Sequence, residues 1–71
     1  MERKYVDSSN LKSVGYSPAD ETLEIEFNSG SVYQYFLVPK NLYDGLMNAS
    51  SHGKYFDQYI KKANFRYREV G

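Results

Sequence analysis

Hydrophobic and polar residues alternate most regularly near the middle of the chain, where Glu24 and Glu26 separate Leu23, Ile25 and Phe27. This period of two is typical of an antiparallel strand that buries one face and exposes the other. We therefore predict a strand that directs its three apolar side chains into a core. We expect the two glutamates to be solvated on the outer face.

Two more segments with strand character flank this one. Leu11–Tyr16 comes before it and ends in the turn-forming residues of Ser17–Glu21. The turn Asn28–Gly30 leads into Ser31–Leu37, which is rich in β-branched and aromatic residues. Together with Thr22–Phe27, these segments predict a three-stranded antiparallel meander.

The second turn decides where Tyr33 and Tyr35 point, because a shift of one residue in the pairing exchanges the two faces. A two-residue turn pairs Phe27 with Val32 and places the tyrosines beside the glutamates. A three-residue loop with its glycine in the left-handed conformation pairs Phe27 with Ser31 and places the tyrosines on the apolar face. The Ser-Gly sequence of this turn suits neither type of two-residue turn well. We therefore predict the three-residue loop.

Helical periodicity replaces strand alternation after Val38-Pro39. Proline is tolerated in the first turn of a helix and holds the residue before it in an extended conformation. Gly45 interrupts the apolar stripe at a cost of about 1 kcal/mol relative to Ala. It predicts either a close approach of another backbone or an early end of the helix. The stripe consists of Leu42, Tyr43, Leu46 and Met47.

A second helix is predicted after the break at Ser50–Gly53, with Ser51 as its N-cap. Asp57 and Lys61 stand in the acid-first order that favours an ion pair four residues apart on a helix. The expected buried side of this helix carries Tyr55, Phe56, Tyr59, Ile60 and Ala63. The expected solvated side carries Lys54, Asp57, Gln58, Lys61 and Lys62.

These elements predict one α+β domain over residues 1–71, with two short helices packed on one face of the three-stranded meander. Phe65–Val70 alternates aromatic and basic residues, and we expect it to add a short edge strand. Residues 1–7 are expected to be flexible. A chain of 71 residues supports only one small core, and we expect a monomer.

The amino-acid composition excludes several kinds of functional site. The chain has no Cys, which excludes disulfides, zinc–thiolate sites, thiol nucleophiles and iron–sulfur clusters. No apolar stretch approaches the roughly 20 residues of a membrane span, and the first residues lack the apolar run of a signal peptide. We therefore expect a cytoplasmic protein that uses no metal and no small-molecule cofactor.

Catalytic chemistry also finds little support in the sequence. His52 follows Ser51 directly, and adjacent residues do not form the nucleophile–base hydrogen bond that a catalytic triad requires. We expect His52 to be a capping or turn residue. Glu24 and Glu26 share a strand face, but nothing predicts the apolar pocket that would raise the pKa of one of them. The chain is therefore expected not to be an enzyme.

The net charge of zero conceals an uneven distribution. Residues 1–51 hold four basic and seven acidic residues, whereas residues 52–71 hold five basic and two acidic residues. A basic and aromatic surface in the C-terminal third is the best candidate for binding a phosphate backbone or an acidic protein. Such binding is expected to be weak and sensitive to salt. The candidate residues are Lys54, Tyr55, Lys61, Lys62, Arg66, Tyr67 and Arg68.

Tyr33 and Tyr35 support two hypotheses. As an exposed pair at strand spacing they could stack on unpaired bases, as in sheet-based binders of single strands. As a buried pair they would contribute large apolar areas to the core, with their hydroxyl groups at the sheet margin. The register argued above favours the core.

Several short motifs occur in an order that points to a known family. They are Ser8-Ser9-Asn10, Val14-Gly15-Tyr16, Leu23-x-Ile25-x-Phe27, Ser29-Gly30, Tyr33-x-Tyr35, Val38-Pro39, Ala49-x-Ser51-x-Gly53-x-Tyr55-Phe56, Ile60 and the aromatic end of the chain. In this order and spacing the chain resembles the KTSC domain, a small bacterial domain found alone or at the C-terminus of some lysyl-tRNA synthetases. The central Tyr-x-Tyr is the signature of that family. We expect Tyr33, Tyr35, Ser51 and Gly53 to be structural.

The resemblance implies no established activity, and RNA binding has been suggested for the family from its association with a tRNA-handling enzyme. We therefore expect a small non-enzymatic module that binds RNA, such as a tRNA-like molecule, weakly through its basic and aromatic C-terminal surface. The alternative is a protein-interaction module that uses the same surface, with an acidic partner and no role in nucleic-acid binding.

Overall fold

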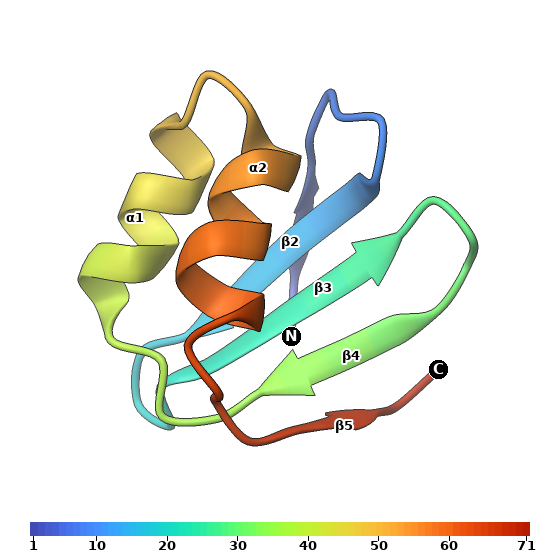
Figure 1. Cartoon of the computed structure of the whole chain (residues 1–71). Helices are drawn as coiled ribbons and strands as arrows, with labels where there is room; N and C mark the ends of the chain where they lie inside the picture. The colour runs from blue at the N-terminus through green and yellow to red at the C-terminus, as the bar shows by residue number, and fades with distance from the viewer.

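The computed structural model describes residues 1–71 and shows an antiparallel sheet with helices on one face (Figure 1). The α+β class is confirmed, but the sheet has five strands in the order β1-β2-β3-β4-β5 rather than three. The strands are β1 (Arg3–Tyr5), β2 (Leu11–Ser17), β3 (Thr22–Phe27), β4 (Val32–Tyr35) and β5 (Tyr67–Glu69). The helical segments are α1 (Lys40–Asn48), α2 (His52–Phe56) and the π-helix η1 (Asp57–Lys61).

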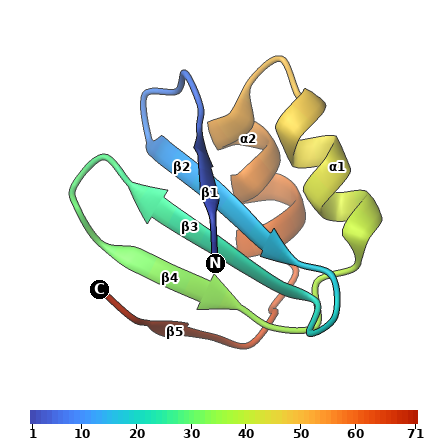
Figure 2. The ribbon, with the colours of Figure 1, turned by 180° about the vertical axis from the view of Figure 1, so that it is seen from behind.

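The additional strand β1 lies within the segment that we expected to be flexible. It lies beside β2 at the edge of the sheet, as Figure 2 shows from behind. In this pairing Arg3 is opposite Gly15. A Cβ atom on Gly15 would lie 2.8 Å from the backbone oxygen of Glu2 and 3.0 Å from the Cγ of Arg3. The missing side chain therefore lets Arg3 cross β2 and reach Glu24 on β3, where its Nη1 lies 2.7 Å from a carboxylate oxygen.

The predicted register between β3 and β4 is confirmed. Ile25 pairs with Tyr33 and Leu23 pairs with Tyr35, so both tyrosines lie on the apolar face of the sheet. The turn is the expected three-residue loop, because the amide of Phe27 donates to the carbonyl of Ser31 over 2.9 Å. Its glycine, Gly30, has a φ of 101°, in the region that favours glycine.

A β-bulge in β2 explains a feature that alternation does not predict. Leu11 and Val14 are both buried although they are three residues apart, which would place them on opposite faces of a regular strand. The pairing with β3 shifts between Leu11 and Ser13. The bulge adds one residue on β2 and so returns both apolar side chains to the same face.

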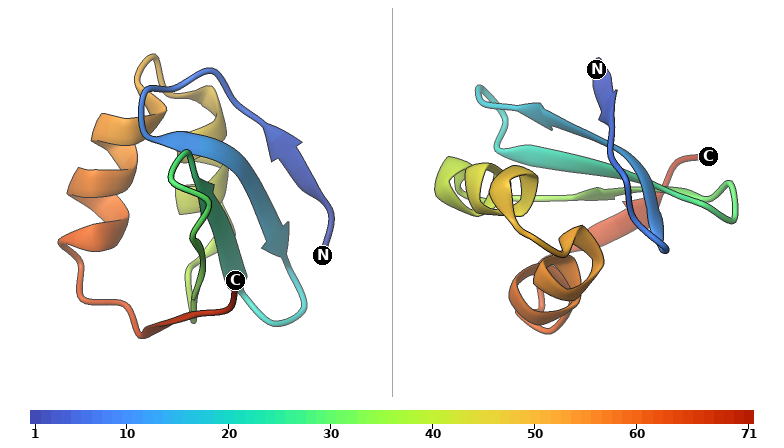
Figure 3. Two further views of the ribbon diagram at one scale, coloured as in Figure 1. Left: turned by 90° about the vertical axis from the view of Figure 1, so that its right-hand side faces the viewer. Right: turned by 90° about the horizontal axis from the view of Figure 1, so that it is seen from above.

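Both helices pack on the same face of the sheet, as Figure 3 shows in two views. The core between these layers draws buried side chains from the three central strands, from the three helical segments and from Val38 in the loop before α1. It consists of Leu11, Val14, Leu23, Ile25, Tyr35, Val38, Leu46, Phe56 and Ile60. No helix has the length and apolar character that crossing a membrane requires.

Helix α1 meets α2 at Gly45, where the close neighbour is the side chain of Tyr55 and not a backbone. A Cβ atom there would overlap the hydroxyl group of Tyr55 and would lie 2.7 Å from the ring carbon Cζ that carries it. The helix ends soon afterwards, at Asn48, as the second explanation for this glycine predicts. Near the C-terminal end of α1, the Nδ1 of His52 lies 2.8 Å from the carbonyl oxygen of Leu46. His52 serves as a capping residue of α1, as expected.

The second helical region begins as predicted and then departs from α-helical geometry. Ser51 caps α2, because its hydroxyl oxygen accepts a hydrogen bond from the amide of Lys54 over 3.3 Å. Farther along, the amide of Lys62 donates to the carbonyl of Asp57, five residues back, over 3.2 Å. The predicted pair of Asp57 with Lys61 is therefore replaced by a contact of Asp57 with the ammonium group of Lys62, 3.5 Å away.

Because of the wider π turn, the buried face of this helix differs from the predicted one. Phe56 and Ile60 are buried as expected, whereas Tyr59 and Ala63 are exposed. A turn that adds one residue cannot keep all five apolar positions on the stripe that an α-helix would give them.

The outer face of the sheet is not the solvated row of glutamates that alternation suggested. Glu24 is buried, and its carboxylate accepts hydrogen bonds from Arg3 over 2.7 Å and from Gln34 over 2.8 Å. Glu26 accepts from the hydroxyl group of Ser13 over 2.8 Å. The expectation was wrong because β1, which was not predicted, brings a cation across this face.

Candidate functional site

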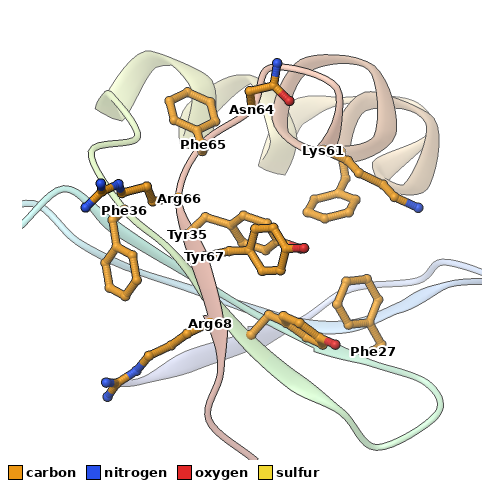
Figure 4. Close-up of a pocket in the computed structure, with 11 residues that line it drawn as sticks. Phe27, Tyr35, Phe36, Lys61, Asn64, Phe65, Arg66, Tyr67 and Arg68 are labelled. Atoms are coloured by element: carbon orange, nitrogen blue, oxygen red, sulfur yellow. The ribbon is translucent and has the colours of Figure 1, made fainter.

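The largest hollow of the molecule lies between β4, β5 and the end of η1, on the helix side of the sheet. This aromatic groove has a volume of about 1070 Å³ and is open to solvent (Figure 4). Strand β5 forms one wall because it pairs with β4 and places Tyr67 opposite Tyr35. Directly opposite residues share a face, so Tyr67 joins the tyrosines of β4. The ring-bearing residues that contact one another here are Phe27, Tyr33, Tyr35, Phe56 and Tyr67.

The three tyrosine rings form a continuous surface within the groove. The ring centroids of Tyr33 and Tyr35 are 6.4 Å apart, and that of Tyr67 lies 5.9 Å from Tyr33 and 5.6 Å from Tyr35. Phe56 meets Tyr35 edge to face at 5.4 Å, and Phe27 meets Tyr33 in the same way at 5.9 Å. Aromatic pairs in these arrangements stabilise one another beyond their burial. The groove wall is therefore held in place before any ligand binds.

The tyrosines of the groove differ in the exposed fraction of their side chains. Tyr35 is 7% exposed and belongs to the core, whereas Tyr67 is 62% exposed. Burial raises the pKa of Tyr35 from its usual 10.0 to about 12, with smaller contributions from Tyr33 and Tyr67. No buried side-chain oxygen or nitrogen lacks a hydrogen-bond partner, and no protein group bonds the Tyr35 hydroxyl. That hydroxyl therefore reaches the solvent of the groove.

A second, polar groove of about 640 Å³ adjoins the aromatic one. It lies between the loop before β2, the loop after β3 and the start of α2. Two lysines line it, Lys54 and Lys61, and Lys61 also lines the aromatic groove. The remaining polar residues of its wall are Ser9, Asn10, Asn28, Ser29, Ser51 and Asp57.

The structure brings together only part of the predicted basic and aromatic surface. Lys54, Lys61 and Tyr67 lie along the two grooves. Tyr55 instead packs against Tyr59, with ring centroids 4.6 Å apart, on the side of α2 that meets α1. Lys62 is paired with Asp57 and lines neither groove.

The two arginines of the surface point the other way. Arg68 pairs with Gln34, which shares the outer face of the sheet with Glu24, so Arg68 lies on that face. Arg66 precedes the first residue of β5, so the strand pairing does not assign it to a face. Both border the aromatic groove, but Figure 4 shows their guanidinium groups directed away from the tyrosine rings. Strand alternation therefore divides the predicted surface between two faces.

Four of the five cations in residues 52–71 have no carboxylate partner. They are Lys54, Lys61, Arg66 and Arg68, since Lys62 alone contacts an acidic side chain. An unpaired cation retains its full capacity to bind an anion. All four border a groove, but only the two lysines line the polar groove.

Sequence analysis missed Phe27 and Phe56 as groove residues, because both belong to an apolar stripe that also predicts a core. Both line the aromatic and the polar groove. The groove could have been located from the expected edge strand, Phe65–Val70. Pairing this strand with the one that carries Tyr33 and Tyr35 would have placed Tyr67 on the same face as these two residues.

The signature positions Ser51 and Gly53 lie at the start of α2. Ser51 is the cap described above, and a Cβ atom on Gly53 would lie 3.4 Å from the amide nitrogen of Asn10 and 3.5 Å from the hydroxyl oxygen of Ser8. Ser8 itself accepts hydrogen bonds from the amides of Asn10 and Leu11. No cluster of three or more His, Cys, Asp or Glu side chains is placed to hold a metal ion.

Comparison with known proteins identifies the domain. The KTSC domain family matches residues 7–67 of this chain. The chain belongs to the KTSC domain family. This KTSC domain also superimposes on the crystal structure of a KTSC domain protein from Yersinia pestis with a TM-score of 0.93, at 40% identity over 99% of this chain and 97% of the other.

Two relatives show the settings in which similar sequences occur. An uncharacterized protein of Stutzerimonas stutzeri is 42% identical over 99% of both chains. A lysine–tRNA ligase of Nostoc sp. is 42% identical over 90% of this KTSC domain, which corresponds to 11% of the ligase. The domain thus resembles both a protein of its own size and a small part of a much larger enzyme.

Proposed function

We propose that this KTSC domain is a non-enzymatic binding module that associates weakly with RNA at the aromatic groove and the cations beside it. The observation that carries the proposal is an open groove walled by Tyr33, Tyr35 and Tyr67, with the unpaired cation Lys61 on its rim. Lys54 extends the site along the polar groove. Arg66 and Arg68 add positive charge at its edge.

The chemistry of the site suits RNA because it offers both kinds of contact that RNA needs. Aromatic side chains stack on bases, with a contribution of about 1–3 kcal/mol per base. Lysine and arginine bind phosphates without regard to sequence. The likeness to a segment of a lysine–tRNA ligase, an enzyme that handles tRNA, supports the same class of ligand.

An NMR titration tests this proposal. Amide shifts are followed while a short structured RNA is added, first at low salt and then at moderate salt. We expect shifts around Lys54, Lys61 and Tyr67 that diminish as salt rises, because binding that releases counterions from phosphates weakens with salt. The absence of shifts with any RNA at low salt would overturn the proposal.

A protein-interaction module is the second candidate, and one observation favours it. Leu37 is 71% exposed and has a φ of 58°, a conformation that costs a non-glycine residue about 1 kcal/mol or more. Residues held in such backbone conformations cluster at functional sites, including those that contact a ligand. Shifts that appear with a protein ligand around Leu37, and with no RNA, would favour this candidate.

A further inference from the structure

The aromatic and polar grooves adjoin, and we refer to the two together as the trough. Phe27, Phe56 and Lys61 line both of them and form their common wall. The trough extends from the tyrosines of β4 and β5, past the end of η1, to the loops on either side of α2's first turn. An apolar, ring-lined half therefore lies beside a half lined by lysines, amides and hydroxyl groups.

The charge of the trough is concentrated in its polar half. Lys54 and Lys61 make no contact with a carboxylate, and the one acidic side chain in the wall, Asp57, is turned toward Lys62 at 3.5 Å. Asn28 donates its amide to the backbone oxygen of Ser8 over 3.1 Å and is thereby held in place on the opposite wall. An anion entering here meets two free cations and fixed amide groups.

We propose that the trough takes single-stranded RNA, with bases against Tyr33 and Tyr67 in the aromatic half and phosphates on Lys61 and Lys54 in the polar half. This inference rests on the proposed function and specifies its ligand class.

Double-stranded RNA does not suit the same site. Its bases are stacked inside the helix and cannot enter a concave wall of rings, and proteins that bind it recognise phosphates and 2′-hydroxyl groups over a broad surface. The cations of this domain do not form such a surface, because Arg68 lies on the outer face of the sheet and the lysines lie on the helix side. Unpaired bases are therefore preferred.

The test compares one labelled oligonucleotide as a single strand and as a duplex by fluorescence anisotropy. We expect the single strand to bind at least about tenfold more tightly, since base stacking is available only to it. Equal or tighter binding of the duplex would overturn this inference while leaving the proposed function standing. No binding of either form would overturn both.

Variants locate the site with matched controls. Tyr67→Leu removes an exposed ring of the trough, and we expect single-strand affinity to fall roughly 5- to 150-fold. Tyr59→Leu removes another exposed ring that lines neither half, and it should leave affinity unchanged. An equal loss in both variants, with unchanged melting curves, would contradict the assignment.

The salt dependence of binding tests whether the phosphates contact the lysines or the arginines. Each phosphate contact with a single strand contributes about −0.7 to the slope of log affinity against log salt. Lys61→Gln should therefore reduce the slope by about 0.7. Lys12→Gln, which changes an exposed lysine outside the trough, should leave it unchanged. A larger effect from Arg68→Gln than from Lys61→Gln would place the phosphates on the outer face and overturn the inference.

Discussion

Tyr35 stands where the core and the groove meet. Its ring is packed against Phe56 and paired across the sheet with Leu23 and Tyr67, while its hydroxyl reaches the solvent of the groove. Tyr35 therefore fits the core hypothesis for the Tyr-x-Tyr signature, in which the ring is buried and the hydroxyl lies at the margin.

Truncating this ring should destabilise the domain strongly. For Tyr35→Ala we expect a loss of about 3 kcal/mol, because a large buried ring is replaced by a cavity. In a domain of this size, that loss corresponds to a fall of at least about 10 °C in melting temperature. Tyr35→Phe keeps the ring and should change stability by less than about 1 kcal/mol. An unchanged melt for Tyr35→Ala would contradict the burial of the ring.

The raised pKa of Tyr35 makes stability fall at alkaline pH. Its pKa is about 12 in the folded state and 10.0 when unperturbed, so the unfolded chain loses this proton first. The stabilising contribution is complete below pH 10 and disappears as the pH rises toward about 12. Burial also raises the pKa of Tyr16, which acts in the same direction.

Urea unfolding measured at several pH values between 9 and 12 checks this prediction. We expect the free energy of unfolding to decline with pH in the wild type and to decline less steeply in Tyr35→Phe, which has no proton to lose at this position. Identical slopes in the two proteins would show that Tyr35 ionises as easily in the folded state as in the unfolded chain.

At the scale of elements, the contact between α1 and α2 depends on Gly45. A glycine-to-alanine change inside a helix usually stabilises by about 1 kcal/mol. Here the new methyl group would overlap the hydroxyl end of Tyr55, whose ring also packs on Tyr59. We therefore expect Gly45→Ala to destabilise, by up to about 2 kcal/mol, because overpacking outweighs the gain in helix propensity.

A double-mutant cycle supplies the control for this prediction. In a Tyr55→Ala background the obstruction is gone, and Gly45→Ala should then stabilise by up to about 1 kcal/mol. The measurement is chemical unfolding of the four proteins. The same sign for Gly45→Ala in both backgrounds would mean that the two helices do not meet at these residues.

Elements differ in how far the sequence predicts them. The register of β4 could be predicted because it follows from a local turn, in which Gly30 alone has the conformational freedom that the three-residue loop needs. Strand β1 could not, because its three residues carry no alternating pattern and are held by the contact of Arg3 with Glu24 across Gly15. The π turn of η1 was not predicted either, because the spacing of the apolar residues Phe56 and Ile60 fits an α-helix equally well.

At the scale of the whole molecule, a single core joins the sheet and the helices. Tyr35, Phe56 and Ile60 bring β4, α2 and η1 into the same cluster as the central strands. We therefore expect cooperative unfolding in which the far-UV signal of the backbone and the near-UV signal of the tyrosines follow one transition. Separate midpoints for the two signals would show that the helices detach before the sheet unfolds.

The candidate site is also a property of the whole chain. It forms where β4 and β5, about thirty residues apart in sequence, become neighbours and where η1 closes over them. Composition and charge predicted Lys61 and Tyr67 as site residues, and both line the aromatic groove. They could not show that Arg68 turns to the opposite face, because that depends on which residue of β4 each residue of β5 pairs with.

The two edge strands, β1 and β5, also affect the tendency of the domain to self-associate. Both β1 and β5 are only three residues long. Each carries charged side chains, Arg3 and Lys4 on one and Arg68 and Glu69 on the other. Short, charged edges are poor templates for adding a strand from another molecule. The sheet is thereby protected from edge-to-edge aggregation even at the high local concentrations of a crowded cell.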